Sequence, residues 1–219
     1  MILLLALLAC TPADRALLEV PVVVEARSGG TLVPARGVEV VLDEATVTLG
    51  ALRLEEAEPL ARRSLSPLAV AHAHPGHDAP GTIGGELLGT WTVDLLAEGT
   101  LLGSAAVYEG DFEGARLELP GPPGAAVAGT ATVDGVERPF RIEVAPAREV
   151  TTIPFPETVV APGPARLALV VDLAHALSHL DWDTADETGD GLLTEADGRL
   201  GNALDFGLVA TPTWTLEPR

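Results

Sequence analysis

The five histidines of this 219-residue chain fall in two short clusters. His72, His74 and His77 form the first cluster, and His175 and His179 form the second. Imidazole is a good ligand for Zn, Cu, Ni and Fe ions. The placement therefore favours metal binding as the role that the histidines share, in one site or in two.

In the first cluster, His72 and His74 stand two residues apart, so in an extended segment both rings point to the same side. The turn predicted at Pro75 and Gly76 brings His77 back toward them. The surrounding segment, about 70–86, is rich in glycine and proline and is predicted to be an irregular histidine loop. The alternative interpretation is a solvated loop in which the histidines are incidental.

The second cluster is predicted to lie on a short helix capped by Asp172. His175 and His179, four residues apart, would then share one face. The opposite, apolar face would carry Leu173, Leu177 and Leu180. If the segment is a strand instead, the histidines share a face with Leu173 and Leu177, and packed interior histidines become the better interpretation.

The rest of the composition narrows the choice of metal. Met1 and Cys10 are the only sulfur-bearing residues, and both have other roles in the N-terminal segment described below. Thioether and thiolate sites are therefore excluded, and an all-imidazole site suits Cu(II) or Zn(II). The acidic side chains nearest in sequence, which are candidate additional ligands, are Asp78, Asp181 and Asp183. Copper has the higher intrinsic affinity because it heads the divalent series.

Residues 186–197 resemble the twelve-residue calcium loop of EF-hand and dockerin proteins. Gly191 stands at the sharp turn of position six, and Leu193 is the apolar anchor at position eight. Two positions depart from the pattern, since Thr188 replaces Asp or Asn and Asp197 is shorter than the usual Glu. The alternative is an acidic turn without an ion. The predicted ligands, at positions one, three, five, seven, nine and twelve, are Asp186, Thr188, Asp190, Leu192, Thr194 and Asp197.

The N-terminus is predicted to be a lipoprotein leader. Residues 1–9 are apolar but too few to span a bilayer as a helix, and Leu7 to Cys10 resemble a lipobox in which Cys10 becomes the lipidated first residue. The alternative is an ordinary secretory peptide with an incidental cysteine. The predicted organisation is therefore a leader (1–9), a tether (10–19) and one domain (20–219). The membrane would be reached by the lipid anchor only, and the protein would lie in the bacterial cell envelope, facing the periplasm or the cell surface.

Strand patterns dominate the remaining sequence and predict an all-β fold, an antiparallel sandwich or barrel-like structure with one or two short helices. The segment 38–54 is expected to form one long strand bent at Gly50. Asp134 and Gly135, between two alternating segments, predict a hairpin with a type I′ turn. The segment 150–160, which contains two prolines, is expected at a sheet edge. The strand predicted last in the chain covers 206–216.

No catalytic motif is present, whether a nucleophile elbow, a P-loop, a dinucleotide fingerprint or His-Glu-x-x-His. The prediction is that the protein is not an enzyme. A formal charge of −19 also argues against nucleic acid as a partner, because phosphates would be repelled.

The segments 38–54 and 170–182 loosely resemble the MbnP-like proteins, copper-associated periplasmic lipoproteins of the metallo-mystery pair. The chain lacks the multiple cysteines of that family. The resemblance implies a copper-binding β-sandwich outside the cytoplasm and a di-haem redox partner that modifies a tryptophan. The candidate tryptophans are Trp91, Trp182 and Trp214.

Two functions follow as hypotheses. The first is a lipid-anchored protein that holds Cu(II) or Zn(II) through clustered histidines and carries structural calcium. The second is a calcium-braced adhesive or assembly module of the cell envelope in which the histidines are incidental.

Overall fold

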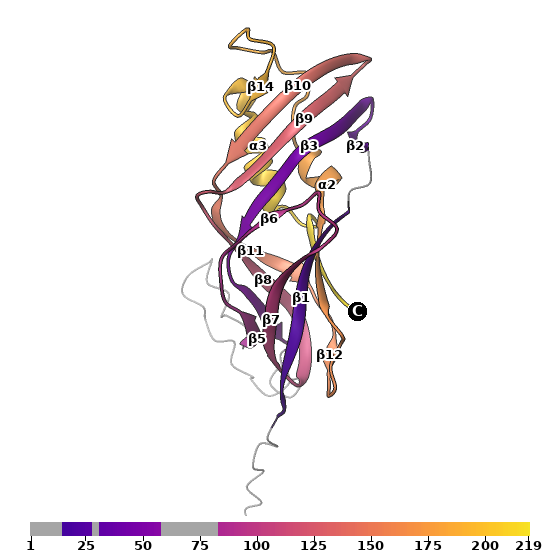
Figure 1. The fold of residues 1–219 in the computed structure, drawn as a ribbon, viewed down its shortest axis with the longest axis vertical. Coiled ribbons are helices and arrows are strands. Elements are labelled where there is room, and N and C mark those ends of the chain that lie inside the picture. Colours follow the sequence, from indigo (N-terminus) through magenta and orange to yellow (C-terminus); the bar gives the residue numbers. More distant parts are fainter. Residues whose placement is uncertain (1–14, 28–30, 58–82) are drawn as a thin grey trace, which may run out of the picture.

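A computed structural model describes residues 15–27, 31–57 and 83–219 and arranges them as two β-sheets with two short helices (Figure 1). The all-β fold predicted from the sequence is confirmed. The buried side chains are mostly Val, Leu, Ala and Ile, as expected for a chain with few aromatic residues.

The larger sheet occupies the lower part of Figure 1 and curls until its two end strands, β11 and β15, approach each other. Across the sheet the order is β11 (Ala147–Pro154), β8 (Gly110–Pro120), β4 (Leu52–Glu56), β5 (Ile83–Leu87), β7 (Thr100–Tyr108), β1 (Leu17–Arg27), β13 (Leu167–Asp172) and β15 (Trp214–Pro218), and β12 (Thr158–Val159) also pairs with β8.

The smaller sheet lies in the upper part of Figure 1. Its order is β14 (Leu193–Thr194), β10 (Val136–Val144), β9 (Ala125–Val133), β3 (Val38–Leu49) and β2 (Leu32–Ala35), and β6 (Trp91–Asp94) also pairs with β3. Helix α3 (Leu200–Val209) packs against β10, and α2 (Leu173–Leu177) packs against β2 and α3. The helices thus cover the smaller sheet.

The predicted hairpin is confirmed. β9 and β10 pair antiparallel from Val133 and Val136 onward. Asp134 and Gly135 at the turn both have positive φ, 49° and 82°, as a type I′ turn requires. β11 lies at one end of its sheet order, as the prolines in that segment predicted.

Several local predictions are wrong. The segment 38–54 is not one strand but two, β3 and β4, which belong to different sheets. At the break, Gly50 donates its N–H to the carbonyl of Glu118 at 2.8 Å, and a Cβ there would stand 3.0 Å from the Cβ of Glu118. The close approach of β8 explains the glycine.

The second error concerns 206–216, predicted as a strand. Residues 206–209 instead continue α3, and β15 begins only at Trp214. Leu200, Leu204 and Leu208 recur every four residues and are all buried, which is the period of a helix face.

The third error concerns the end of the histidine loop. Residues 83–86 lie in β5, although Gly84 and Gly85 led us to expect no regular structure. A Cβ on Gly85 would stand 3.1 Å from side-chain atoms of Leu54 and Val107, so glycine permits the strands to pack closely.

The sheets were predicted to be antiparallel, but both are mixed, because β1 pairs parallel with β13 and β10 pairs parallel with β14. The first strand also begins at Leu17, inside the segment expected to be a tether. Among the described residues, no helix is long and apolar enough to cross a membrane.

Candidate functional site

The second histidine cluster lies where the sequence predicted, on and just after α2. Asp172 caps the helix, since its Oδ1 accepts the backbone N–H of His175 at 2.9 Å. Leu173, Leu177 and Leu180 are buried, whereas His175 and His179 are half-buried. The helix ends at Leu177, so His179 stands just beyond the end of the helix.

The two imidazoles belong to a row of three aromatic rings. The ring centroids of His175 and His179 are 5.3 Å apart with the planes at 89°. On its other side, His179 meets the ring of Phe206 at 5.0 Å and 86°. Phe206 comes from α3 and is 55% exposed, so it forms the outer end of the row.

The Nε2 atoms of His175 and His179 are both shielded from solvent and lack a hydrogen-bond partner. A buried polar atom without a partner is unfavourable by about 1–3 kcal/mol. Edge-to-face contacts with a neighbouring ring satisfy such a nitrogen only weakly. Two orphaned nitrogens in one pair therefore fit the coordination chemistry of imidazole.

The histidine pair offers two imidazole nitrogens, too few for a metal site on their own. Among the residues that the structure describes, no three His, Cys, Asp or Glu side chains come together as a metal site requires. Asp181 and Asp183 are exposed. The predicted ligands His72, His74 and His77, like Asp78 and Cys10, lie outside the described residues.

The loop 186–197, which was predicted to bind calcium, is organised around the carboxylate of Asp186 at position one. Asp186 Oδ1 accepts the N–H of Gly189 and the hydroxyl of Thr188, at 2.6 and 2.9 Å. Its Oδ2 accepts the N–H of Gly191 at 2.6 Å. Gly191 has φ of 85°, so the sharp turn predicted at position six is confirmed.

The carboxylate at position twelve is fully buried, at 0% exposure. Asp197 Oδ1 accepts the N–H of Glu187 at 2.7 Å. Its Oδ2 accepts both the N–H and the hydroxyl of Thr194, at 2.7 and 2.9 Å. Asp197 therefore joins the two ends of the loop.

Backbone donors lower the pKa values of both carboxyl groups. The N–H groups of Gly191 and Gly189 lower the pKa of Asp186, and those of Thr194 and Glu187 lower the pKa of Asp197. The negative charge of Asp186 acts in the opposite direction on Asp197. Both groups are consequently held in the anionic form that a cation would bind.

Position eight attaches the loop to the smaller sheet. Leu193 is buried and pairs parallel with Phe140 in the two-residue strand β14. At position five, Asp190 is exposed and accepts the N–H of Leu192 through Oδ1 at 2.9 Å. The apolar anchor predicted from the sequence therefore docks on β10, while Asp190 is left at the outer side of the loop.

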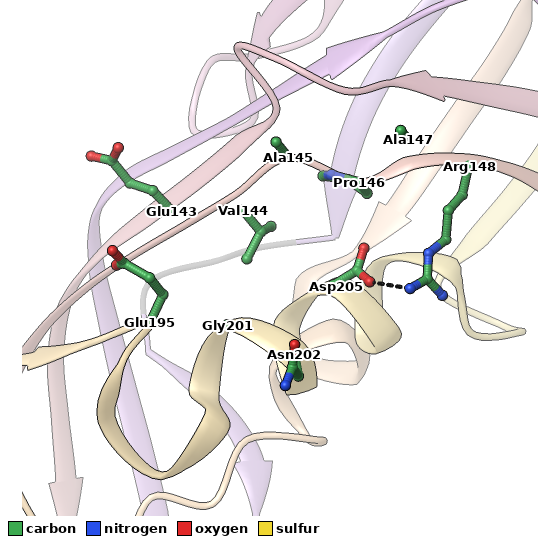
Figure 2. A pocket seen from close by; sticks show the side chains of 10 residues that line it. All are labelled: Glu143, Val144, Ala145, Pro146, Ala147, Arg148, Glu195, Gly201, Asn202 and Asp205. Carbon is green, nitrogen blue, oxygen red and sulfur yellow. Dashed lines mark ion pairs between the residues drawn. The ribbon is translucent and has the colours of Figure 1, made fainter.

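A pocket of about 490 Å³ lies between the β10–β11 connection and helix α3, with Glu195 of the loop 186–197 at its edge (Figure 2). Glu195 of the loop and Asn202 of α3 line one wall. Asp205 and Arg148 form an ion pair of 2.6 Å across it. This pocket was not predicted, because the segment 206–216 was expected to be a strand and α3, which forms one wall, was not expected.

The three tryptophans differ in exposure. Trp182 and Trp214 are buried at 3% and 1%, and Trp91 is half-buried. Trp214 donates Nε1–H to the carbonyl of Leu208 at 2.6 Å. Trp182 packs edge-on against Phe140 with the ring centroids 5.1 Å apart, and its buried Nε1 has no partner.

Comparison of the chain with protein-family models, with curated proteins and with solved structures gives no match.

Proposed function

We propose that this chain is a non-catalytic metal-binding protein of the bacterial cell envelope, anchored through lipid on Cys10. Histidines hold Cu(II) or Zn(II), and calcium in the loop 186–197 braces the domain. The observation that carries the proposal is the pair of buried, unpartnered Nε2 atoms of His175 and His179.

The chemistry of the pair suits a borderline-soft cation. A neutral imidazole binds such an ion through the lone pair of Nε2, and structural zinc takes four ligands. His175 and His179 supply two of them. We assign the remaining two to the cluster of His72, His74 and His77.

Calcium is proposed for the loop because its donor set consists of oxygen atoms only, which is what Ca²⁺ requires. The proposed donors are the carboxylates of Asp186, Asp190 and Asp197 and the carbonyl of Leu192; in the part of the chain that the structure describes, no three acidic side chains are gathered as at a metal site. The two departures from the usual pattern place the expected dissociation constant in the range of extracellular modules, about 10⁻⁴–10⁻³ M.

The test is calorimetric titration of metal-stripped protein, beginning at Cys10→Ser, with Zn(II) and Cu(II). Two variants separate the clusters: His175→Ala/His179→Ala and His72→Ala/His74→Ala/His77→Ala. A single shared site predicts that each variant loses tight binding. Two sites predict that each variant loses one of two binding steps.

Tight binding that survives in both variants, or uptake no stronger than that of exposed carboxylates, would contradict the proposal. Acidification provides a check, because protons compete for imidazole ligands. The bound metal should be released as the pH falls through about 6.5, the ordinary range of imidazole.

A second candidate is a calcium-braced adhesive or assembly module. The observation that favours it is the pocket in Figure 2, because Glu195 of the calcium loop lines its wall. In that case calcium would rigidify a binding surface and the histidines would be incidental. Such a module binds calcium but takes up no Zn(II) at the histidines, so the same titrations distinguish the two candidates.

A further inference from the structure

The first described residue of the chain is held at one end of the larger sheet. The guanidinium of Arg15 forms an ion pair of 2.6 Å with Glu56. It also lies over the ring of Tyr108, 5.6 Å from the ring centroid. The domain is therefore attached from Arg15 onward, and only the four residues 11–14 separate it from Cys10.

Three large apolar side chains are exposed at this end of the sheet. Leu17, Tyr108 and Val160 are 53%, 46% and 59% exposed. Leu17 and Tyr108 stand directly opposite each other in the pairing of β1 with β7. Next to Val160, Ala161 donates its N–H at 2.7 Å to the carboxylate of Glu109, the neighbour of Tyr108. The three side chains therefore lie at one end of the domain, and we call them the apolar end.

We propose that the apolar end rests on the same bilayer that holds the lipid of Cys10, and that this contact directs the far end of β1 toward the aqueous compartment. The inference rests on the lipid anchor of the proposed function. Five residue steps of at most about 3.6 Å keep Arg15 within about 18 Å of Cys10. Such a short tether makes the contact intramolecular, with an effective concentration on the order of millimolar. An apolar patch too small to bind a membrane by itself is therefore sufficient.

The chemistry of the apolar end fits the interfacial zone of a zwitterionic bilayer. Tyrosine is favoured at this depth, because its ring is apolar while its hydroxyl stays hydrated. Two exposed acidic side chains near the apolar end, Glu19 and Asp111, would be repelled by anionic headgroups. The expected partner is therefore a bilayer rich in phosphatidylethanolamine or phosphatidylcholine.

Strand β1 separates the apolar end from the histidine pair. It runs for 11 residues from Leu17 to Arg27, which corresponds to about 33 Å along the strand. Arg27 pairs with Asp172, the residue that caps α2. Figure 1 shows β1 running from the lower end of the molecule toward α2. A domain that stands on its apolar end therefore presents α2, with the histidine pair, away from the membrane.

The test uses the lipidated mature protein in phosphatidylcholine vesicles, labelled with one dye. Lipid on Cys10 blocks the only thiol of the chain, so Val160→Cys provides a unique site for the environment-sensitive dye acrylodan. Val136→Cys is the matched control. Val136 is similarly exposed, at 58%, and begins β10 in the β9–β10 hairpin at the other end of the molecule (Figure 1). Nitroxide-bearing lipids report contact with the bilayer, and acrylamide reports access from water.

The dye at position 160 is expected to shift its emission to the blue and to be quenched several-fold more by nitroxide lipids than the dye at position 136. Its quenching by acrylamide should fall. Leu17→Asp in the Val160→Cys protein should abolish these differences. Leu101→Asp should leave them unchanged, because Leu101 is 66% exposed but pairs with Val23, farther along β1. Added phosphatidylglycerol should weaken the nitroxide quenching.

Mass spectrometry of the mature protein separates the inference from the anchor. If Cys10 carries lipid but the dyes at positions 160 and 136 behave alike, or Leu17→Asp changes nothing, the inference is overturned while the lipid anchor stands. If Cys10 carries no lipid, the anchor of the proposed function fails, and the inference fails with it. Neither result bears on metal binding by the histidine pair.

Discussion

At the scale of single residues, Asp172 connects the sequence to the histidine pair. Its carboxylate caps α2 through the N–H of His175. Asp172→Ala should lower the free energy of unfolding by about 1 kcal/mol, the usual contribution of such a cap. Urea unfolding followed by circular dichroism measures this change. Asp172→Asn keeps a capping oxygen and should recover most of the loss, and equal losses in both variants would argue against capping.

The carboxylates of the calcium loop predict how stability depends on acid. The pKa values of Asp186 and Asp197 are lowered in the folded protein. Groups of this kind contribute stability above their unfolded pKa, near 3.8, and lose it as the pH falls through the folded value. In chelator, the melting temperature should therefore drop from about pH 4 downward.

Asp197→Asn is the matched variant for the acid prediction, because it removes one titrating carboxylate but keeps its size. The variant should be less stable than the parent at pH 6 and should show a flatter decline below pH 4. Thermal melts from pH 6 to pH 2.5 compare the two proteins. Parallel curves would show that Asp197 does not contribute to the acid dependence.

Residues whose roles are local were predictable from the sequence. Asp172 and Gly191 act on neighbours within a few positions, so spacing alone identified the cap and the turn. Spacing also identified Leu193 as the apolar anchor, but not its partner Phe140 on β10. The role of Phe206 was not predicted, because its contact joins α3 to His179, which follows α2 and is 27 residues earlier in the chain. The Asp205–Arg148 ion pair was missed for the same reason.

At the scale of elements, the contact between α2 and α3 gives a sharp test. Gly207→Ala would normally stabilise a helix by up to about 1 kcal/mol. Here the added methyl group meets the carbonyl of Ala176, and overpacking of this kind is unfavourable by about 1–3 kcal/mol. Net destabilisation in urea unfolding is therefore expected. Asn202→Ala, an exposed change in the same helix, should be neutral or stabilising; gain of stability at Gly207 would contradict the packing.

The loop 186–197 also belongs to this scale, because it contains β14 and leads through a 3₁₀ turn into α3. Added calcium should raise the melting temperature. At a free concentration 100 times the dissociation constant, the gain in free energy of unfolding is about 2.7 kcal/mol. Scanning calorimetry with calcium and with chelator measures it. Asp190→Ala should lose the gain, and a gain that persists in this variant would place calcium elsewhere.

Element identity was predicted well where burial alternates along a strand, as in β9 and β10. The prediction of element type failed where the same apolar pattern is compatible with both a strand and a helix. The apolar residues of 206–216 fit a strand until the buried leucines at 200, 204 and 208 are considered together. The division of 38–54 between two sheets depends on the approach of β8 at Gly50, which no local pattern reveals.

At the scale of the whole molecule, the dominant electrostatic feature is the excess of negative charge. The formal charge is −19, and the arginines of the described ion pairs are mostly at the surface. Salt weakens both the general repulsion and these surface pairs, and with 32 acidic against 13 basic residues the repulsion is the larger effect. Raising sodium chloride from 10 to about 300 mM in chelator should therefore stabilise the fold.

A stabilisation of about 1 kcal/mol in a domain of this size corresponds to a rise of about 2–4 °C in melting temperature. Thermal melts at the two salt concentrations test this prediction. A fall in melting temperature with salt would mean that the surface ion pairs outweigh the repulsion between carboxylates.

The fold class followed from the sequence because strand patterns, turn residues and an aliphatic core all agree. The candidate histidine site could be predicted from the sequence only in part. Which histidines approach each other depends on long-range packing, and the first cluster lies outside the residues described. The parallel pairings of β1 with β13 and of β10 with β14 likewise arise from the three-dimensional arrangement and have no local signature.

The most direct test of metal binding by the histidine pair is a zinc titration of ¹⁵N-labelled protein followed through the imidazole nitrogens by long-range proton–nitrogen correlation. The account predicts that the Nε2 resonances of His175 and His179 both shift to metal-bound values as one equivalent of zinc is added. If both Nε2 resonances stay at their metal-free positions while zinc binds elsewhere, the pair is a packed aromatic cluster and the central claim is wrong.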